Sequence, residues 1–334
     1  MWLKASTLIF AACLLLTSCT KKSDEVVVYT SIDQVFSEPI LKDFEQATGI
    51  RVKPVFDTEE TKSTGVLNRL IAEKDNPQCD VFWSGDPVRA LVLKRKGITS
   101  SYLSPNAAEI PDEFKDAEDH WIGFSSRARV LLYNTNLVKS EAAPNSIYDF
   151  INLKWKGQGT IANPLFGTTS FHVAAIFSAL GDAAAKEFFA KMKANGVIVA
   201  TSNGDVRKRV ADGEVAFGLA DTDDANEAIK EGKSVAMVFL DQPGIGTLIV
   251  PNTVSLIKNS PHAENGKKLI DYLLTREVEA KLAASCAQMP LLPNAIAVSG
   301  VTSVDQITPM KIDYEHVAQK LEEIQPFLKD WVGK

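Results

Sequence analysis

Three aspartates fall within four consecutive positions of the stretch GLADTDDANEA, residues 218–228: Asp221, Asp223 and Asp224. They follow the apolar run 215–220, which is typical of a buried strand. Like charges this close repel one another and gain little in a solvated loop. The carboxylates therefore face water, a metal ion or the polar end of a ligand. We expect one of them to cap the following helix, and Asp223 to face a cleft, where it meets an ammonium or hydroxyl group before a metal.

Elsewhere the sequence lacks residue sets with the spacing of known catalytic or metal sites. The four histidines form no His-x-x-x-His pair, and there is no Cys-x-x-Cys, Gly-x-Ser-x-Gly or Walker loop. The aspartate cluster begins like an EF-hand loop, but Asn226 stands where that loop needs glycine and Gly232 where it needs an acid. We expect a binding protein with no cofactor and no enzymatic activity. A hydrolase that uses the carboxylates is the alternative from another class.

Strand-like and helix-like segments alternate around these residues. Asp86 and Pro87 are typical of a helix N-cap and first helical position, and Pro39 is expected in the first turn of its helix. The predicted strands of the first set are 25–31, 50–56 and 79–85; a second alternating set covers 159–232, followed by a long strand, a helical pair and an amphipathic helix at the C-terminus. This pattern predicts an α/β protein with two units, each a mainly parallel sheet flanked by helices, joined by two crossing strands.

Ligands of open α/β sheets lie outside the carboxyl ends of the strands. Six polar loops follow predicted strands and are the candidates for binding: 30–34, 57–60, 83–86, 163–170, 201–205 and 220–224.

The N-terminus carries an export signal. Lys4 precedes an apolar run, 8–16, that is too short to span a bilayer. The run ends in Leu-Thr-Ser-Cys, which resembles the lipobox of bacterial lipoproteins. We expect residues 1–18 to be a signal peptide, Cys19 to carry the lipid and 19–25 to form a tether, so that the protein is anchored on the periplasmic side of a bacterial membrane. An ordinary signal peptide with a chance cysteine is the alternative.

The composition fits a soluble body behind that anchor. The chain has 334 residues, of which 45% are hydrophobic and 23% charged, and a net charge of −6. It has no basic block that would favour nucleic acid and no later apolar segment long enough to cross a membrane. Cys79 and Cys286 remain after the N-terminal segment, and they form either a disulfide or two buried small apolar residues.

The ordered set of segments resembles the solute-binding proteins of bacterial ABC importers, in the cluster that includes ferric-ion-binding proteins. The matching stretches are 26–52, 79–85, 121–138, 153–171, 210–232 and 263–283. The resemblance implies the two-lobe, type II periplasmic-binding-protein fold, a hinge that closes on a ligand, and delivery to separate permease and ATPase subunits. The implied lobes are 26–126 plus 253–300 (lobe 1) and 127–252 plus 301–334 (lobe 2), in a monomer.

The residues that hold ferric ion in such relatives are not matched. Their adjacent tyrosines fall on Thr222 and Asp223, their histidine near Ile32–Asp33 and their glutamate on Gly85. Tyrosinate coordination of iron is therefore not expected. Carboxylates can still hold a hard ion, so ferric iron or another hard metal is the alternative ligand.

The anion side of the relatives' site is matched by the segment 163–171. Gly167 frees the backbone, and the N–H groups and hydroxyls that follow can converge on an anion at a helix start; these residues are Thr168, Thr169 and Ser170. Plain helix capping is the alternative. Asn203 matches a further anion-side residue, and Arg127 either adds a bidentate phosphate contact or forms an interior salt bridge.

The opposing lobe has fewer candidates, all in the loops after its strands: Ser31, Asp33, Asp57 and Ser84. Trp83 either covers an apolar part of the ligand or packs in the core. Since an anion pocket faces a cluster of carboxylates, the resemblance implies a small organic ligand that bears a phosphate or phosphonate group and an ammonium or hydroxyl end.

Overall fold

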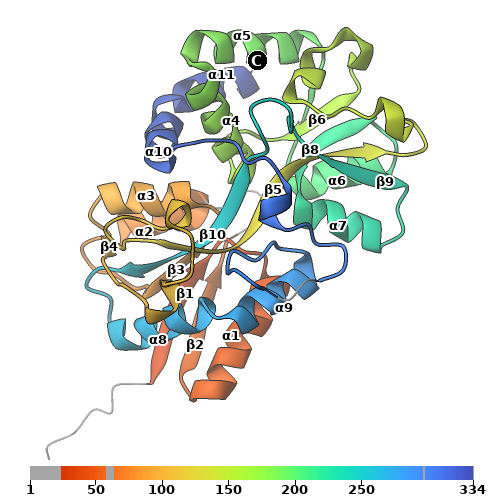
Figure 1. Ribbon diagram of the computed structural model, residues 1–334. Helices are drawn as coiled ribbons and strands as arrows, with labels where there is room; N and C mark the ends of the chain where they lie inside the picture. The colour runs from red at the N-terminus through yellow and green to blue at the C-terminus, as the bar shows by residue number, and fades with distance from the viewer. Residues whose placement is uncertain (1–23, 58–63, 296–297, 334) are drawn as a thin grey trace, which may run out of the picture.

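The computed structural model describes residues 24–57, 64–295 and 298–333. The predicted signal peptide and Cys19 lie outside these residues. Two lobes of mixed helix and strand are stacked one above the other in Figure 1, and two strands, β5 (Ile122–Asn134) and β10 (Ile249–Ile257), cross between them. No helix in the described ranges is long and apolar enough to span a membrane.

The lower lobe in Figure 1 is built on three parallel strands, β1, β2 and β3, with β10 pairing antiparallel to β3. Its elements are β1 (Glu25–Thr30), α1 (Gln34–Thr48), β2 (Arg51–Phe56), α2 (Thr64–Ala72), β3 (Val81–Ser84), α3 (Pro87–Arg95), β4 (Thr99–Ser100), α8 (Ala263–Leu273) and α9 (Arg276–Cys286). We call it lobe 1.

The upper lobe, lobe 2, is built on the parallel strands β8, β6 and β7, with β5 antiparallel to β8 and to β9. Its elements are β6 (Gly159–Ala162), α4 (Gly167–Leu180), α5 (Asp182–Ala194), β7 (Ile198–Ala200), α6 (Asn203–Ala211), β8 (Phe217–Asp221), α7 (Thr222–Lys230), β9 (Val235–Phe239), α10 (Tyr314–Glu323) and α11 (Gln325–Gly333). Parallel strands flanked by helices in each lobe confirm the predicted fold class.

The helix starts follow the local sequence with one exception. The carboxylate of Asp86 accepts from the N–H of Arg89 at 3.1 Å and Pro87 begins α3, as predicted. In contrast, α1 begins at Gln34, so Pro39 lies inside the helix and the prediction of a first-turn proline is wrong. Burial of the apolar face that includes Ile40 and Phe44 holds the helix together despite the backbone hydrogen bond that proline removes.

The crossing strands carry a bulge at the junction of the lobes. The pairing of β5 with β10 shifts between Pro251 and Asn252, and Ser125 adopts a positive φ of 46°. The buried carboxylate of Glu279 accepts from the N–H of Ser125 at 2.7 Å and also from the N–H groups of Leu291 and Leu292. Because a bulge bends a strand, it turns β5 from one lobe into the other just before Arg127.

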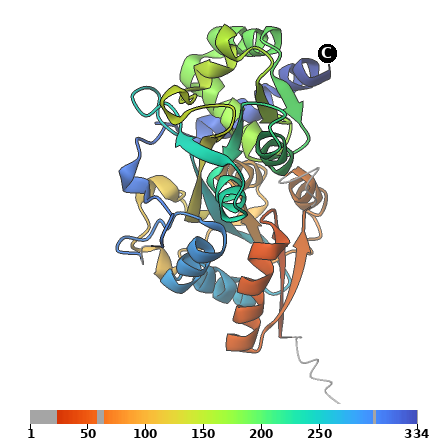
Figure 2. The same cartoon turned by 90° about the vertical axis from the view of Figure 1, so that its right-hand side faces the viewer.

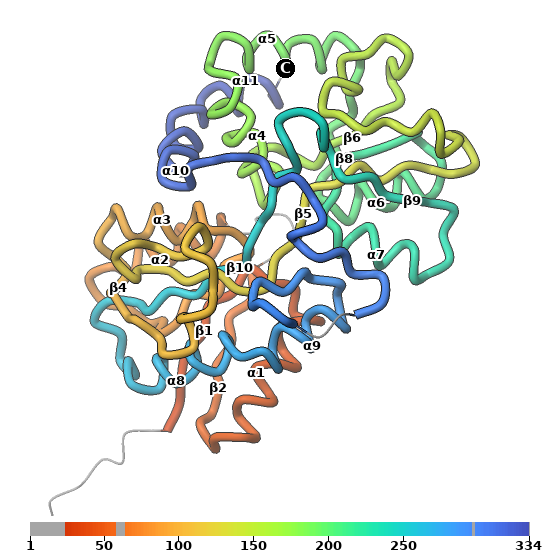
Figure 3. The backbone as a smooth tube through the Cα atoms, in the orientation of Figure 1, coloured from red at the N-terminus to blue at the C-terminus, as the bar shows by residue number. Residues whose placement is uncertain are grey.

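The C-terminal helix α10 ties the two lobes together along one side of the molecule (Figure 1). α10 packs against both α3 and α4, and Arg95 of α3 forms ion pairs with Glu315 and Glu322 of α10. Figures 2 and 3 show the chain after α9 running upward from lobe 1 to reach α10 and α11. Lobe 2 is therefore completed by a segment that enters it from lobe 1.

Burial in the hydrophobic cores distinguishes between the alternatives for the two cysteines and for Trp83. Cys79 and Cys286 are both free and buried, and they belong to separate hydrophobic clusters, so they are the buried apolar residues of the second alternative. Trp83 is fully buried and its ring centroid lies 5.6 Å from that of Phe124. The alternative in which Trp83 covers a ligand is wrong, because its side chain points from β3 into the lobe 1 core.

Candidate ligand-binding site between the lobes

A polar cavity lies between the lobes at the carboxyl ends of their parallel strands. It encloses about 560 Å³ including its solvent-open part, within the range of small-molecule sites. Lobe 1 contributes Ser31, Asp33 and Gly85; the other lining residues come from β5 and lobe 2 and comprise Arg127, Ala162, Asn163, Phe166, Gly167, Thr168, Thr169, Thr201, Ser202, Asn203, Asp221, Asp223 and Asp224. Five of the six predicted loops thus meet here. Of the sixth loop, 57–60, the structure describes Asp57 alone, and Asp57 does not line the cavity.

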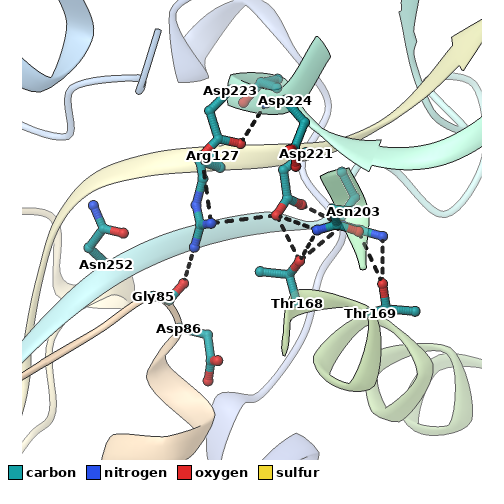
Figure 4. A network of polar contacts seen from close by, with 12 residues as sticks. Gly85, Asp86, Arg127, Thr168, Thr169, Asn203, Asp221, Asp223, Asp224 and Asn252 are labelled. Atoms are coloured by element: carbon teal, nitrogen blue, oxygen red, sulfur yellow. Dashed lines mark hydrogen bonds and ion pairs between the residues drawn. The ribbon is translucent and has the colours of Figure 1, made fainter. Parts of the chain in front are cut away.

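A buried ion pair forms the lobe 2 wall. Nη1 of Arg129 lies 2.5 Å from Oδ1 of Asp221, and both side chains are at most 1% exposed. The other carboxylate oxygen of Asp221 accepts from the hydroxyl of Thr168 at 2.7 Å and from Nδ2 of Asn203 at 3.1 Å (Figure 4). Guanidinium, hydroxyl and amide donors therefore converge on one carboxylate.

The same ion pair sets the charge of its neighbours. Burial raises the pKa of Asp221, but the charges of Arg129 and then Arg127 outweigh burial, so the pKa lies below the usual value and the group is ionised at neutral pH. Burial, and after it the charge of Arg129, lowers the pKa of the fully buried His172 from 6.5 to about 3. His172 is therefore neutral behind the wall.

Arg127 bridges the two lobes across the cavity. Its Nη2 donates to the carbonyl of Gly85 in lobe 1, while Nη1 lies 3.5 Å from Asp221 and 3.7 Å from Asp223 of lobe 2. Figure 4 shows its guanidinium between Gly85 and Asp223. Burial lowers its pKa, but four carboxylates, led by Asp223 and Asp221, outweigh burial and raise it. Arg127 both forms salt bridges and lines the cavity, so the two alternatives for it are not exclusive.

The three aspartates all line the cavity, but Asp221 is buried whereas Asp223 and Asp224 are partly exposed. Asp221 occupies the N-cap position of α7, but its side chain makes no capping hydrogen bond because it is held by Arg129. Asp223 and Asp224 lie in the first turn of α7, where negative charge is favoured. One oxygen from each of the three carboxylates lies within 4.8 Å of the others, which is close enough for a shared cation.

The start of α4 faces the cavity. Gly167 has a positive φ of 56° and begins the helix, and the preceding residue, Phe166, provides no side-chain cap. The hydroxyls differ from expectation, since Thr168 and Thr169 accept from Nη1 and Nη2 of Arg129 at 3.0 and 3.1 Å. What the helix start offers a ligand is therefore its first backbone N–H groups, which have no partner within the helix.

Three predicted site residues do not line the cavity. Ser170 is fully buried; its hydroxyl accepts from Arg89 of α3 at 2.6 Å and donates to the carbonyl of Gly167, so it links the lobes. Ser84 is buried in β3 and its hydroxyl accepts from the N–H of Asp86. Asp57 accepts from the N–H of Val66, at the start of α2. None of the three lines the cavity in this structure, and a ligand contact by any of them stays a prediction.

The main residue missed by sequence reasoning is Arg129, together with the carbonyl of Gly85. A signal for Arg129 was present, because it stands two positions after Arg127 in a predicted strand and so shares its face. No residue-type signal exists for a backbone carbonyl.

Comparison with known proteins places the chain among binding proteins. It is 25% identical to a putative 2-aminoethylphosphonate-binding periplasmic protein of Salmonella typhimurium. The alignment covers 98% of this chain and 94% of the Salmonella protein. Iron-bound HitA of Pseudomonas aeruginosa matches it in structure with a TM-score of 0.83 at 20% identity, covering 92% of this chain and 99% of HitA.

A third match is the periplasmic binding protein AfuA of Actinobacillus pleuropneumoniae with fructose-6-phosphate bound. Its TM-score is 0.79 at 22% identity, covering 92% of this chain and 98% of AfuA. These structures establish the type II periplasmic-binding-protein fold. The family model described as bacterial extracellular solute-binding protein matches residues 40–308. The chain therefore belongs to the family of bacterial extracellular solute-binding proteins.

Proposed function

We propose that this protein is the receptor of an ABC importer for a small organic molecule that carries a phosphonate or phosphate group and an ammonium or hydroxyl end. The observation that carries the proposal is the mixed charge of one cavity. Arg127 and the start of α4 lie on the same cavity wall as Asp223 and Asp224, with Asp33 opposite.

The anionic end of such a ligand fits the start of α4. Backbone N–H groups at a helix N-terminus favour a phosphoryl group, and those of Gly167 and Thr168 belong to cavity-lining residues. Arg127 adds a guanidinium that reaches both lobes. Since that guanidinium contacts a carbonyl of lobe 1, a ligand bound to it would hold the lobes together.

The cationic or hydroxyl end fits the carboxylates. The negative charges of Asp33, Asp223 and Asp224 each raise the pKa of Arg127, so the three carboxylates lie around one point of the cavity. Carboxylates accept hydrogen bonds from ammonium and hydroxyl groups. One relative, from Salmonella, is named for binding 2-aminoethylphosphonate, and this molecule has both a phosphonate and an ammonium group. That name supports the proposed ligand class.

The rest of the proposal follows from the family and the N-terminus. The receptor acts as a monomer, performs no reaction, and hands its ligand to permease and ATPase subunits on separate chains. It is exported and anchored through a lipid on Cys19, outside the described residues. Loss of membrane association in a Cys19→Ala variant, measured by fractionation of cells, tests the anchor; unchanged association contradicts it.

Binding is tested by thermal unfolding of the purified mature protein with three probes. 2-Aminoethylphosphonate is expected to raise the melting temperature, since a ligand at about 100 times its Kd adds about 2.7 kcal/mol. Ethylphosphonate, which lacks the ammonium, and ethylamine, which lacks the phosphonate, are expected to give smaller shifts. No shift with 2-aminoethylphosphonate or with sugar phosphates would contradict the proposal.

A second candidate is capture of ferric or another hard cation. It is favoured by the three carboxylates within 4.8 Å of one another and by the oxygen preference of hard ions. Under this candidate, protein purified from cells contains stoichiometric metal, and ferric citrate raises its melting temperature while 2-aminoethylphosphonate does not. Metal-free protein that is unaffected by added iron would eliminate it.

A further inference from the structure

The site contains one set of converging hydrogen-bond donors suited to an oxyanion, and a side chain of the protein already occupies it. Arg129, Thr168 and Asn203 direct donors at one point at the start of α4, and the carboxylate of Asp221 occupies that point at 2.5, 2.7 and 3.1 Å. A guanidinium, a hydroxyl and an amide next to a helix N-terminus form the donor set that a phosphoryl group would choose.

Arg129 is also closed off from the cavity. Its side chain is 0% exposed, and it is absent from the cavity lining, whereas Thr168, Asn203 and Asp221 are present. Its two terminal nitrogens already contact the carboxylate and the hydroxyls of Thr168 and Thr169. A ligand in the cavity therefore meets Arg127 and the outer side of Asp221 but not Arg129.

We propose that Asp221 is a built-in counter-ion that determines specificity: it takes the place of a ligand anion at Arg129 and restricts the site to ligands with a single phosphoryl group and a balancing ammonium. This inference concerns the site of the proposed function and rests on it for the ligand class. The charges on the cavity side agree, because Arg127 is the one cationic residue among the described lining residues and it faces Asp33, Asp223 and Asp224. Ligands with a second anionic group are repelled.

Removing the charge of Asp221 should make this donor set available to an external anion. Asparagine has nearly the shape of aspartate but leaves Arg129 without its counter-ion, so an external anion that displaces the neutral amide side chain can pair with Arg129. We expect Asp221→Asn to bind inorganic phosphate roughly tenfold to a hundredfold more tightly than the wild type, as hydrogen bonds to charged groups allow. Phosphonoacetate, in which a carboxylate replaces the ammonium end, is expected to change in the same direction.

Isothermal titration of the folded protein with inorganic phosphate measures the gain. Two controls separate it from a general change of charge. Asp75→Asn removes an exposed acid that does not line the cavity, and Asp221→Asn with Arg129→Gln removes both charges of the pair. Neither control is expected to gain phosphate affinity. A folded Asp221→Asn variant with no gain, or an equal gain in the double variant, would overturn the proposal.

If Asp221→Asn is too unstable to titrate, two measurements replace the titration. Its melting temperature is compared in phosphate and in chloride at equal ionic strength, because a ligand of the folded state raises it, and Asp221→Ser is titrated in the same way. Equal melting temperatures in both salts, with no gain in Asp221→Ser, overturn the inference. Wild-type binding of 2-aminoethylphosphonate is a separate readout: if it is absent while Asp221→Asn gains phosphate, the proposed function fails and the inference stands.

Discussion

The two walls of the cavity are built differently. The wall of lobe 2 is a connected network in which Arg129, Asp221 and Thr168 hold one another and are almost entirely buried. Among the described residues, lobe 1 contributes Ser31, Asp33 and Gly85 to the lining. Polar groups fixed by their neighbours need no reordering when a ligand arrives. Lobe 2 is therefore the preorganised half of the site, and lobe 1 completes it through the bridge from Arg127 to Gly85.

The largest expected effect comes from breaking the lobe 2 wall. Arg129→Met removes the nearest cation from the buried Asp221, whose other ion pair is with Arg127 at 3.5 Å. We expect the free energy of unfolding to fall by about 3–5 kcal/mol, measured by urea denaturation. Arg51→Met removes an arginine whose partner is the strand residue Glu25 but whose own side chain is largely exposed, and it should cost less than about 1 kcal/mol. Similar losses in both variants would mean that the lobe 2 wall is no more rigid than the surface.

The bridge between the walls should matter most for binding. Arg127→Met removes the guanidinium that contacts lobe 1 and the proposed phosphoryl group. The binding free energy for 2-aminoethylphosphonate should therefore weaken by about 2–5 kcal/mol, measured by calorimetry. Arg276→Met, in the partly exposed pair with Glu109, is the control and should leave affinity unchanged. Unaltered binding by the Arg127 variant would remove this bridge from the site.

Acid should weaken lobe 2 through His172. Its pKa is depressed to about 3 in the folded protein, so the unfolded chain binds a proton first as the pH falls below 6.5. The His172 contribution to stability is complete above that pH and declines toward pH 3, by up to about 1.4 kcal/mol per pH unit. The free energy of unfolding of the wild type and of His172→Gln, plotted against pH across this range, should converge at low pH. A constant difference between the two proteins would contradict the effect.

The smallest expected effect lies in lobe 1. Asp33→Asn keeps the size of a side chain on the less organised wall, and affinity for 2-aminoethylphosphonate should fall by about 1 kcal/mol, while Asp223→Asn should cost about 2 kcal/mol. Both losses are measured by calorimetry at one pH and salt concentration, and their ratio gives the relative contribution of the two walls to binding. A larger loss for Asp33→Asn than for Asp223→Asn would reverse it.

Much of the fold was predictable because its signals are local. Apolar runs, helical spacing and caps such as Asp86 and Pro87 act within a few residues, and alternation of strand and helix selects a parallel sheet. Pro39 shows the limit, since burial of a helix face outweighs a local preference. For the site, loops at strand ends predicted most of the lining residues, Asp221 and Thr168 among them.

What each of those residues does depends on contacts between distant parts of the chain. Asp221 and Thr168 both reach the cavity, but Arg129 turns one into an internal anion and the other into its donor. Ser170 matched the predicted anion pocket, and Arg89, 81 positions earlier, uses its hydroxyl as a link between lobes.

The sequence by itself determined an exported-type chain with two α/β lobes, and the loops in which a binding site had to lie, because strand order and loop position follow from short-range patterns. The tertiary structure decided which charges in those loops cancel. Coulomb energies depend on separation and burial rather than on sequence distance, so the pairing of Asp221 with Arg129, 92 positions apart, exists only in the folded protein.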